Sequence, residues 1–420
     1  MADAMFALAR VRRTRGADLL PDSAILQQLG SLGIVWRERL LTPMVMVRLF
    51  LMQVLFGNTS IAHVRQLSGI DFAPASYCEA RGRLSLQLLR CLLRWTLSAA
   101  EAMDLGLDTP SIGGRVMVVD CTSFSMSDAP TLRKQFGLPR GRGCKPGVSY
   151  PIAKVMALLD LRTGCFTRLL AGPLYRHEAS GVIRLHRQLR TGDILLADRA
   201  FCSFVHVALL SRRGVFVCFR LHQRRKSVSR GLERWRRPAR CPDWMDPRQF
   251  AALPESIEVR IVRYTIKRNG YRTKHVAVAT TLMDEQTWPD AKIAELYGHR
   301  WTIETCFDHL KTTMKMSVLK CRTVGGIRRE LMMYLIAYNL IRLAMLAWAL
   351  ENQTEVNRVS FVDAMRYLAA RLLGLDGVRR LLVNPHRPGR RQLRVIRRRM
   401  KEYDLLTEPR SSRMAGENAG

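Results

Sequence analysis

Acidic residues are scarce in this chain of 420 residues: 35 Asp and Glu stand against 68 Lys and Arg, a formal net charge of +33. An imbalance of this size builds a positive potential that attracts polyanions, so nucleic acid is the expected partner. Apolar residues are not scarce, since they make up 48% of the sequence. That fraction excludes a largely disordered chain and, at this length, predicts two or three folded domains.

Zinc and disulfide motifs are also missing. The ten cysteines include no Cys-x-x-Cys pair, and no histidines accompany them at zinc-finger spacing. Scattered cysteines indicate buried apolar side chains in a reducing compartment. Residues 1–16 lack the pattern of a secretory signal. The longest apolar run, Leu331 to Leu350, carries Asn339 and Arg342, and a central Arg is costly in a bilayer. We expect a buried helix there and no membrane contact.

The pattern of residues changes along the chain and predicts four parts. Residues 1–110 have helical periodicity and predict a helical N-terminal domain that binds DNA. Residues 111–221 and 285–375 mix short β-rich runs with helical stretches, which predicts one α/β core. Between them, residues 222–284 form a basic, β-rich insertion. Residues 376–420 form a basic C-terminal tail.

Two segments are dense in arginine. Residues 220–240 hold nine Arg or Lys and one Glu, and residues 387–401 hold eight Arg or Lys and no acid. We expect these segments to carry most of the salt-sensitive affinity for DNA, because each neutralised phosphate releases counterions. The alternative is a solvated run of charge that only aids solubility. Within the insertion, alternating residues around Asn269 and Gly270 predict a β-hairpin.

Two aspartates each end a β-rich run. Asp120 ends VMVVD, and Asp198 ends ILLAD. Phosphodiester chemistry on two metal ions needs carboxylates that converge from separate elements, because Mg²⁺ prefers oxygen ligands. Taken singly, each Asp is more typical of a turn or a helix cap. Taken together, they predict a carboxylate pair across neighbouring strands.

A third acidic residue lies in the segment YGHRWTIETCFDHLK. At 100° per residue, four side chains share one helix face about 60° wide: Tyr297, Arg300, Glu304 and Lys311. Asp308 falls at the edge of this face, so the spacing leaves both it and Glu304 open as the third carboxylate. The alternative for Arg300 and Glu304 is a simple i, i+4 ion pair on a solvated helix.

The series Y-x₂-R-x₃-E-x₆-K resembles the signature of the DDE transposases of bacterial insertion sequences, in the group called IS-four. The runs VVDCTSFSMSDAP and LLADRAFCS resemble the two Asp motifs of these transposases, and YLIAYNLIR resembles the helix after their Glu helix. The resemblance extends from about residue 112 to residue 410. It is weak over the N-terminal hundred residues.

The resemblance implies an α/β, ribonuclease-H-like catalytic core with an inserted β-rich domain. Asp120 and Asp198 would lie on strands and Glu304 on a helix, and together they would bind two Mg²⁺ or Mn²⁺ ions. This set would activate water to nick the transposon end and then the freed 3′ hydroxyl, through a hairpin intermediate. We therefore expect a cut-and-paste transposase in the bacterial cytoplasm, associated with the nucleoid.

The resemblance also implies contacts to DNA. Tyr297, Arg300 and Lys311 would hold backbone phosphates near the cut. The partners would be double-stranded terminal inverted repeats and target DNA, with a homodimer in the synaptic complex. In such enzymes a flipped base stacks on an aromatic ring; Trp288 or Trp235 would serve, although each is singly more typical of packing.

Three other functions remain open from the sequence. A decayed, inactive transposase would act only as a DNA-binding protein, and the intact Asp120, Asp198 and Glu304 argue against it. A nuclease or resolvase with the same core would have no need of the full Tyr–Arg–Glu–Lys series. An RNA-binding protein agrees with the charge but leaves the carboxylates unexplained.

Overall fold

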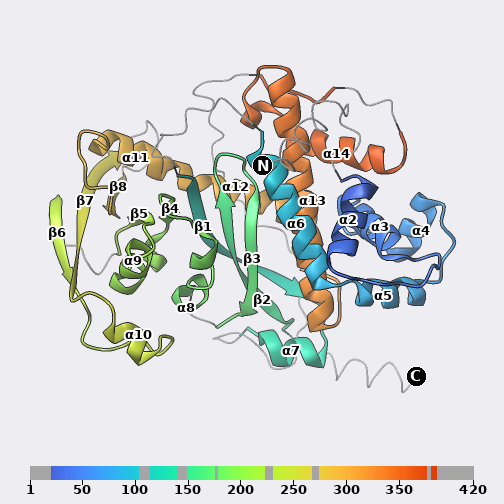
Figure 1. Ribbon diagram of the computed structural model, residues 1–420, viewed down its shortest axis with the longest axis horizontal. Helices are drawn as coiled ribbons and strands as arrows, with labels where there is room; N and C mark the ends of the chain where they lie inside the picture. Colours follow the sequence, from blue (N-terminus) through green and yellow to red (C-terminus); the bar gives the residue numbers. More distant parts are fainter. Residues whose placement is uncertain are drawn as a thin grey trace.

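A central mixed sheet lies between two layers of helices (Figure 1). The computed structural model describes residues 20–103, 114–139, 149–175, 178–222, 230–266, 274–375 and 380–385. The N-terminal helices lie at one end of the molecule, and the strands of the basic insertion lie at the other (Figure 1). The class is therefore mixed α/β.

The core of the sheet consists of five strands in the order β3-β2-β1-β4-β5. They are β1 (Val116–Met126), β2 (Ile152–Asp160), β3 (Phe166–Pro173), β4 (Ile194–Ala197) and β5 (Phe216–Arg220). The first three pair antiparallel, and β4 and β5 run parallel to β1. The core is therefore one mixed sheet, which agrees with the α/β class that we expected.

The basic insertion continues the same sheet. Its strands are β6 (Gly231–Arg236), β7 (Ser256–Ile266) and β8 (Lys274–Thr280), and β8 pairs antiparallel with β5. Strands β7 and β8 pair antiparallel, as predicted for a hairpin. Asn269 and Gly270, at the predicted turn, lie outside the described residues. The described strands of this segment therefore extend the central sheet.

Alternation along the strands divides the apolar side chains between two cores. Val118 and Leu196 face one layer, whereas Met117 and Leu195 face the other, because successive side chains point to opposite faces. The first layer contains α2 (Asp22–Ser31), α3 (Pro43–Leu55), α4 (Ile61–Ser68), α5 (Pro74–Arg83), α6 (Leu86–Glu101), α7 (Pro130–Phe136), α11 (Asp290–Gly298), α12 (Thr302–Asp308), α13 (Val324–Glu351) and α14 (Phe361–Leu372). The second contains α8 (Glu178–Val182), α9 (Phe204–Ser211) and α10 (Pro247–Ala251), with the 3₁₀ turns η1 (His186–Gln188) and η2 (Arg199–Phe201).

Helix α13 is the centre of the first layer. Within the described part of the chain it is the one helix long and apolar enough to cross a membrane, and 83% of its most apolar window is buried inside the protein. The Asn339 side chain accepts from the Phe166 N–H at 3.0 Å and donates to the Phe166 carbonyl at 3.1 Å. Arg342 donates twice to the Thr163 carbonyl, at 3.2 and 3.1 Å. The two polar residues that interrupt the apolar run therefore bind the first residue of β3 and the turn before it, and the prediction of a buried helix is confirmed.

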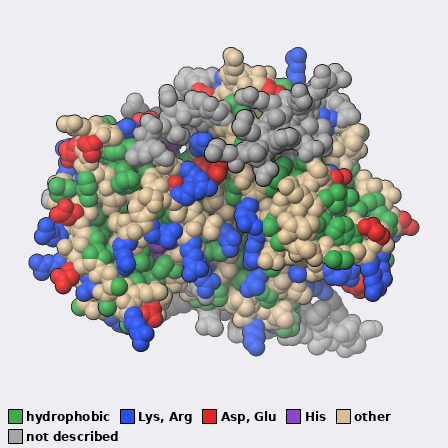
Figure 2. Space-filling view, in the orientation of Figure 1, with side chains coloured by type: hydrophobic (Ala, Val, Ile, Leu, Met, Phe, Trp, Pro, Cys, Tyr) green, Lys and Arg blue, Asp and Glu red, His purple; other side chains and the backbone are tan. Residues whose placement is uncertain are grey.

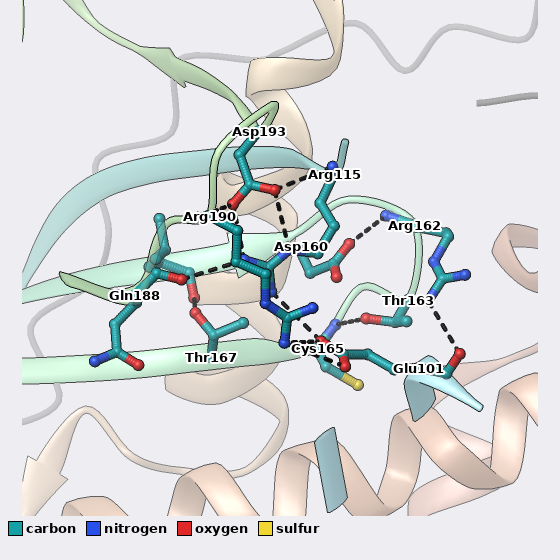
Figure 3. Close-up of polar contacts among 11 residues, drawn as sticks. Glu101, Arg115, Asp160, Arg162, Thr163, Cys165, Thr167, Gln188, Arg190 and Asp193 are labelled. Carbon is teal, nitrogen blue, oxygen red and sulfur yellow. Dashed lines mark hydrogen bonds and ion pairs between the residues drawn. The ribbon is translucent and has the colours of Figure 1, made fainter. Parts of the chain in front are cut away.

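A network of ion pairs joins the end of α6 to the starts of β1 and β4 (Figure 3). Arg115 donates to the Asp193 carboxylate at 2.8 Å, and the backbone N–H of Arg190 donates to the same carboxylate at 2.8 Å. Glu101 lies 3.4 Å from Arg115 and 3.0 Å from Arg190. Only 2% of the Asp193 side chain is exposed. The buried Asp193 carboxylate at the centre of this network therefore joins the N-terminal ends of two parallel strands.

Candidate active site

The sheet register places Asp120 beside Asp198. In the parallel pair of β1 and β4, Val119 is opposite Ala197, so the next residue on each chain segment is an aspartate. Strand β4 ends at Ala197, and η2 begins directly after Asp198, whose carbonyl accepts from the Phe201 N–H at 3.0 Å. Two buried strands therefore bring two carboxylates to neighbouring positions of one sheet.

The segment that carries Glu304 is not one continuous helix. Helix α11 ends at Gly298, a 3₁₀ turn η4 (His299–Trp301) follows, and α12 leads into a π-helical turn η5 (His309–Thr313). Our assumption of a uniform 100° per residue across this segment is therefore wrong. At the π turn the His309 ring stacks on Phe361 of α14, with centroids 4.0 Å apart. Such turns alter the helical register, often at functional sites.

Arg300 lies between the first aspartate and the glutamate. Its Nη1 is 3.4 Å from Asp120 Oδ2, and its Nη2 is 3.1 Å from Glu304 Oε1. Only 5% of the Arg300 side chain is exposed. The i, i+4 ion pair expected as the alternative is thus present, but its Arg300 is buried and also contacts a third residue on another element. Arg300 thereby links the helical carboxylate to the strand.

Burial is the main influence on Asp120 and raises the pKa of its carboxyl to about 6. The Cys121 N–H donates to Asp120 Oδ1 at 2.7 Å, and this hydrogen bond and the charge of Arg300 both lower the pKa. The negative charges of Glu304 and Asp198 raise it. The three carboxylates therefore interact electrostatically across the site.

Asp198 provides the test of whether these residues suit a divalent cation. Its Oδ1 is buried and has no hydrogen-bond partner in the described part of the chain. A buried, unpartnered carboxylate oxygen costs free energy that a bound cation recovers. Within the same residues no three acidic, His or Cys side chains are already grouped as metal ligands. The donors suit Mg²⁺ or Mn²⁺ in their chemistry, while Arg300 occupies the space between two of them.

The structure distinguishes the two candidates for the third carboxylate. Asp308 is exposed and accepts a hydrogen bond from Thr312 Oγ1 at 2.7 Å. Glu304 is half-buried and is joined to Asp120 through Arg300. The geometry thus favours Glu304, because Asp308 contacts its own helix instead of the site.

Tyr297 and Lys311, the other residues of the signature, lie at different depths. The Tyr297 side chain is buried, and burial raises its pKa above the ordinary value, with a smaller contribution from the charge of Asp198. The Lys311 Nζ lies 5.4 Å from the ring centroid of Phe124, on the strand that carries Asp120. The short strand β9 (Val318–Leu319) then pairs with the end of β1. The chain after Glu304 therefore returns to the strand of Asp120.

The two tryptophans proposed as stacking surfaces are both buried. Trp235 and Trp288 are each 3% exposed, which agrees with the packing role that the sequence made more typical of each one singly. Trp301 is instead 50% exposed, and the Arg300 guanidinium carbon lies 4.5 Å from its ring centroid. Sequence reasoning missed Trp301, although its position directly after Arg300 was a usable signal.

Carboxylates that converge from neighbouring positions of one sheet and from one helix are typical of metal-dependent enzymes that act on phosphodiesters. Residues 112–340 match the family described as "Transposase DDE domain". The chain is 23% identical to the transposase InsG for insertion sequence element IS4 of Escherichia coli (strain K12), over 73% of this chain and 69% of the relative. It also resembles a cryo-EM structure of the piggyBac transposase synaptic complex with hairpin DNA, with 13% identity and a TM-score of 0.46, over 84% of this chain and 77% of that chain.

The chain belongs to the DDE transposase family, and within it to the transposases of the IS4 group. Family membership implies a metal-dependent enzyme that cuts DNA. The resemblance inferred from the Tyr–Arg–Glu–Lys series is thereby confirmed.

Proposed function

We propose that this transposase cleaves the terminal inverted repeats of its insertion sequence and joins them to target DNA through a hairpin intermediate. Asp120, Asp198 and Glu304 hold two Mg²⁺ or Mn²⁺ ions in this proposal. The observation that carries it is the placement of Asp120 beside Asp198, with Glu304 linked to Asp120 by Arg300. We also propose that a homodimer holds the two ends together, inside the bacterial cell.

Bound divalent ions supply charge stabilisation at the scissile phosphate and lower the pKa of attacking water. The protein's own groups hold and orient the reacting strand. Arg300 and Lys311 offer positive charge on the same side of β1 as Asp120, and the exposed ring of Trp301 offers a surface for an unpaired base. Stacking of a base on an aromatic ring contributes about 1–3 kcal/mol.

Positive charge on the surface supports DNA as the partner. In Figure 2, Lys and Arg side chains outnumber acidic ones across the middle of the visible face, where Figure 1 places α6 and β3. Arg90 on α6 is exposed, and burial together with the charge of Arg90 lowers the pKa of Arg168 on β3. Neither arginine forms an ion pair within the described residues. Two neighbouring positive charges favour the binding of an anion such as a DNA phosphate.

The arginine-rich insertion is partly neutralised by acidic residues. Arg230 pairs with Asp290 at 2.7 Å, Arg234 with Glu258 at 3.1 Å, and Arg240 with Asp243 at 3.0 Å. Residues 223–229 and the tail segment 387–401 lie outside the described residues. The contribution of the two segments to DNA affinity stays a prediction.

Hairpin formation tests the proposed function. A duplex in which flanking DNA follows the terminal repeat, labelled at the 5′ end of the strand to be nicked, is incubated with the protein and Mg²⁺ and analysed on a denaturing gel. We expect a nicked strand of the length of the repeat segment first and then a product of twice that length, because the freed 3′ hydroxyl attacks the opposite strand and displaces its flanking DNA. A nuclease of the same core would give breaks without the longer product, and an inactive DNA-binding protein would give neither.

Replacing Lys311 by Ala is expected to lower the rate of end cleavage about tenfold while it changes binding to unrelated DNA by less than about twofold. The reason is that a single charge near the scissile phosphate acts mainly on positioning. Cleavage is measured under single-turnover conditions, and binding by titration at fixed salt. Lys134→Ala, which removes an exposed lysine of α7, is the matched control. Equal losses on both DNAs would mark Lys311 as a general backbone contact.

A further inference from the structure

The buried guanidinium of Arg300 uses the same carboxylate oxygens that a divalent cation needs. Asp120 Oδ1 accepts the Cys121 N–H at 2.7 Å, so Oδ2 is the carboxylate oxygen that no backbone N–H contacts within the described residues. Arg300 Nη1 approaches that Oδ2 at 3.4 Å, and Nη2 approaches Glu304 Oε1 at 3.1 Å. A cation bound by Asp120 and Glu304 would therefore meet a fixed positive charge at its own ligands.

We propose that Arg300 and the divalent cation compete for Asp120 and Glu304, and that cation binding transfers the guanidinium to a DNA phosphate. The inference rests on the proposed function, because it assumes that these carboxylates bind metal. Two positive charges a few ångströms apart repel strongly where burial limits screening. An Arg does not lose its proton at neutral pH. Its charge, once displaced from the carboxylates, therefore needs another anion.

The surroundings of Arg300 suit such a transfer. Its guanidinium carbon lies 4.5 Å from the ring centroid of Trp301, which is 50% exposed. The ring reaches from the buried site to solvent, so the guanidinium can move outward along one aromatic face and keep its cation–π contact. Its Nε is buried without a hydrogen-bond partner in the described part of the chain, so one donor is not committed to the present position.

This competition makes metal binding and DNA binding support each other. While Arg300 neutralises Asp120 and Glu304, cation affinity is low. When a phosphate takes the guanidinium, the carboxylates become available and cation affinity rises. By linkage, a bound cation raises the affinity for phosphate by the same factor. The device would restrict the assembled metal centre to protein that is already on DNA.

The test measures Mn²⁺ affinity without DNA, with free Mn²⁺ followed by electron paramagnetic resonance. We expect Arg300→Gln to bind Mn²⁺ about tenfold more tightly than the wild type, the scale of one charge interaction at a partly buried site, although it cleaves DNA more slowly. The control is Arg234→Gln. Arg234 makes the same 3.1 Å contact to Glu258 on the surface, with side chains 69% and 62% exposed, and its loss should leave Mn²⁺ affinity unchanged.

Unchanged or weaker Mn²⁺ binding by Arg300→Gln would overturn the proposal, and so would an absence of binding by both proteins. If Arg300→Gln lacks a native circular dichroism spectrum, the proposal is tested on the wild-type protein by tryptophan fluorescence. Added Mg²⁺ should then change tryptophan fluorescence in the wild type and not in Trp301→Phe, and an identical response in both would overturn the proposal. Wild-type cleavage is measured separately. An absence of cleavage would contradict the proposed function. Intact cleavage, together with an unchanged Mn²⁺ affinity of Arg300→Gln, would contradict only the proposed competition.

Discussion

Replacing Asp120, Asp198 or Glu304 by Ala is expected to abolish Mg²⁺-dependent cleavage of a terminal-repeat duplex, with a loss of about 1,000-fold or more. Binding to the same duplex should stay within a few-fold of the wild type. The reason is that the carboxylates serve the chemistry, whereas affinity for DNA comes mainly from Lys and Arg contacts to phosphate. Single-turnover cleavage and equilibrium binding are measured on the same preparations.

Asp308→Ala is the matched control for this series. Asp308 lies four residues after Glu304, is exposed, and its side chain accepts a hydrogen bond from Thr312. Its replacement should leave cleavage near the wild-type rate. If Asp308→Ala failed to cleave the duplex and Glu304→Ala cleaved it, the third carboxylate would be Asp308. Near-normal cleavage by Asp120→Ala, Asp198→Ala or Glu304→Ala would show that the replaced residue is not a metal ligand.

The second large effect is expected on stability. Asp193→Ala should lower the free energy of unfolding by about 3–5 kcal/mol, the usual effect of removing one partner of a buried ion pair. It leaves Arg115, whose side chain is 14% exposed, without its 2.8 Å partner. It also leaves the backbone N–H groups of Arg115 and Arg190 without their acceptor. Urea denaturation followed by circular dichroism gives the difference.

Asp243→Ala is the control for this variant. Asp243 pairs with Arg240 at 3.0 Å, but both side chains are 86% exposed, and exposed pairs contribute little. We expect almost no change in the urea midpoint. Similar losses for the buried and the exposed pair would show that the network at the strand starts does not hold β1 and β4 in register.

The two aspartates could be found from the sequence because each follows an apolar, β-rich run, and this pattern needs only nearby residues. Asp198 does follow the last residue of β4, whereas Asp120 lies within β1, which continues to Met126 beyond the run that we took as its end. The adjacency of Asp120 and Asp198 follows once β1 and β4 pair in parallel. The buried helix α13 was accessible for a similar reason, because its Asn339 and Arg342 are costly in lipid.

Other features depend on contacts between distant residues. The π turn at His309 is stabilised by Phe361 of another helix, so the pattern within residues 297–311 does not reveal it. The pairing of β8 with β5, which merges the insertion with the central sheet, is likewise set by long-range register. The backbone of Trp288 is held by Arg260, a residue 28 positions earlier, which donates to the Trp288 carbonyl at 2.7 Å. These features are fixed by packing and not by local periodicity.

The central claim is that this chain cuts and joins its transposon end with a carboxylate-bound divalent cation. The hairpin assay, run on the wild type with and without Mg²⁺, tests that claim most directly. The account predicts the double-length hairpin strand in Mg²⁺ and unreacted duplex when the ion is chelated. Hairpins that form equally well under chelation, or cleavage in Mg²⁺ that yields only open ends, would contradict it.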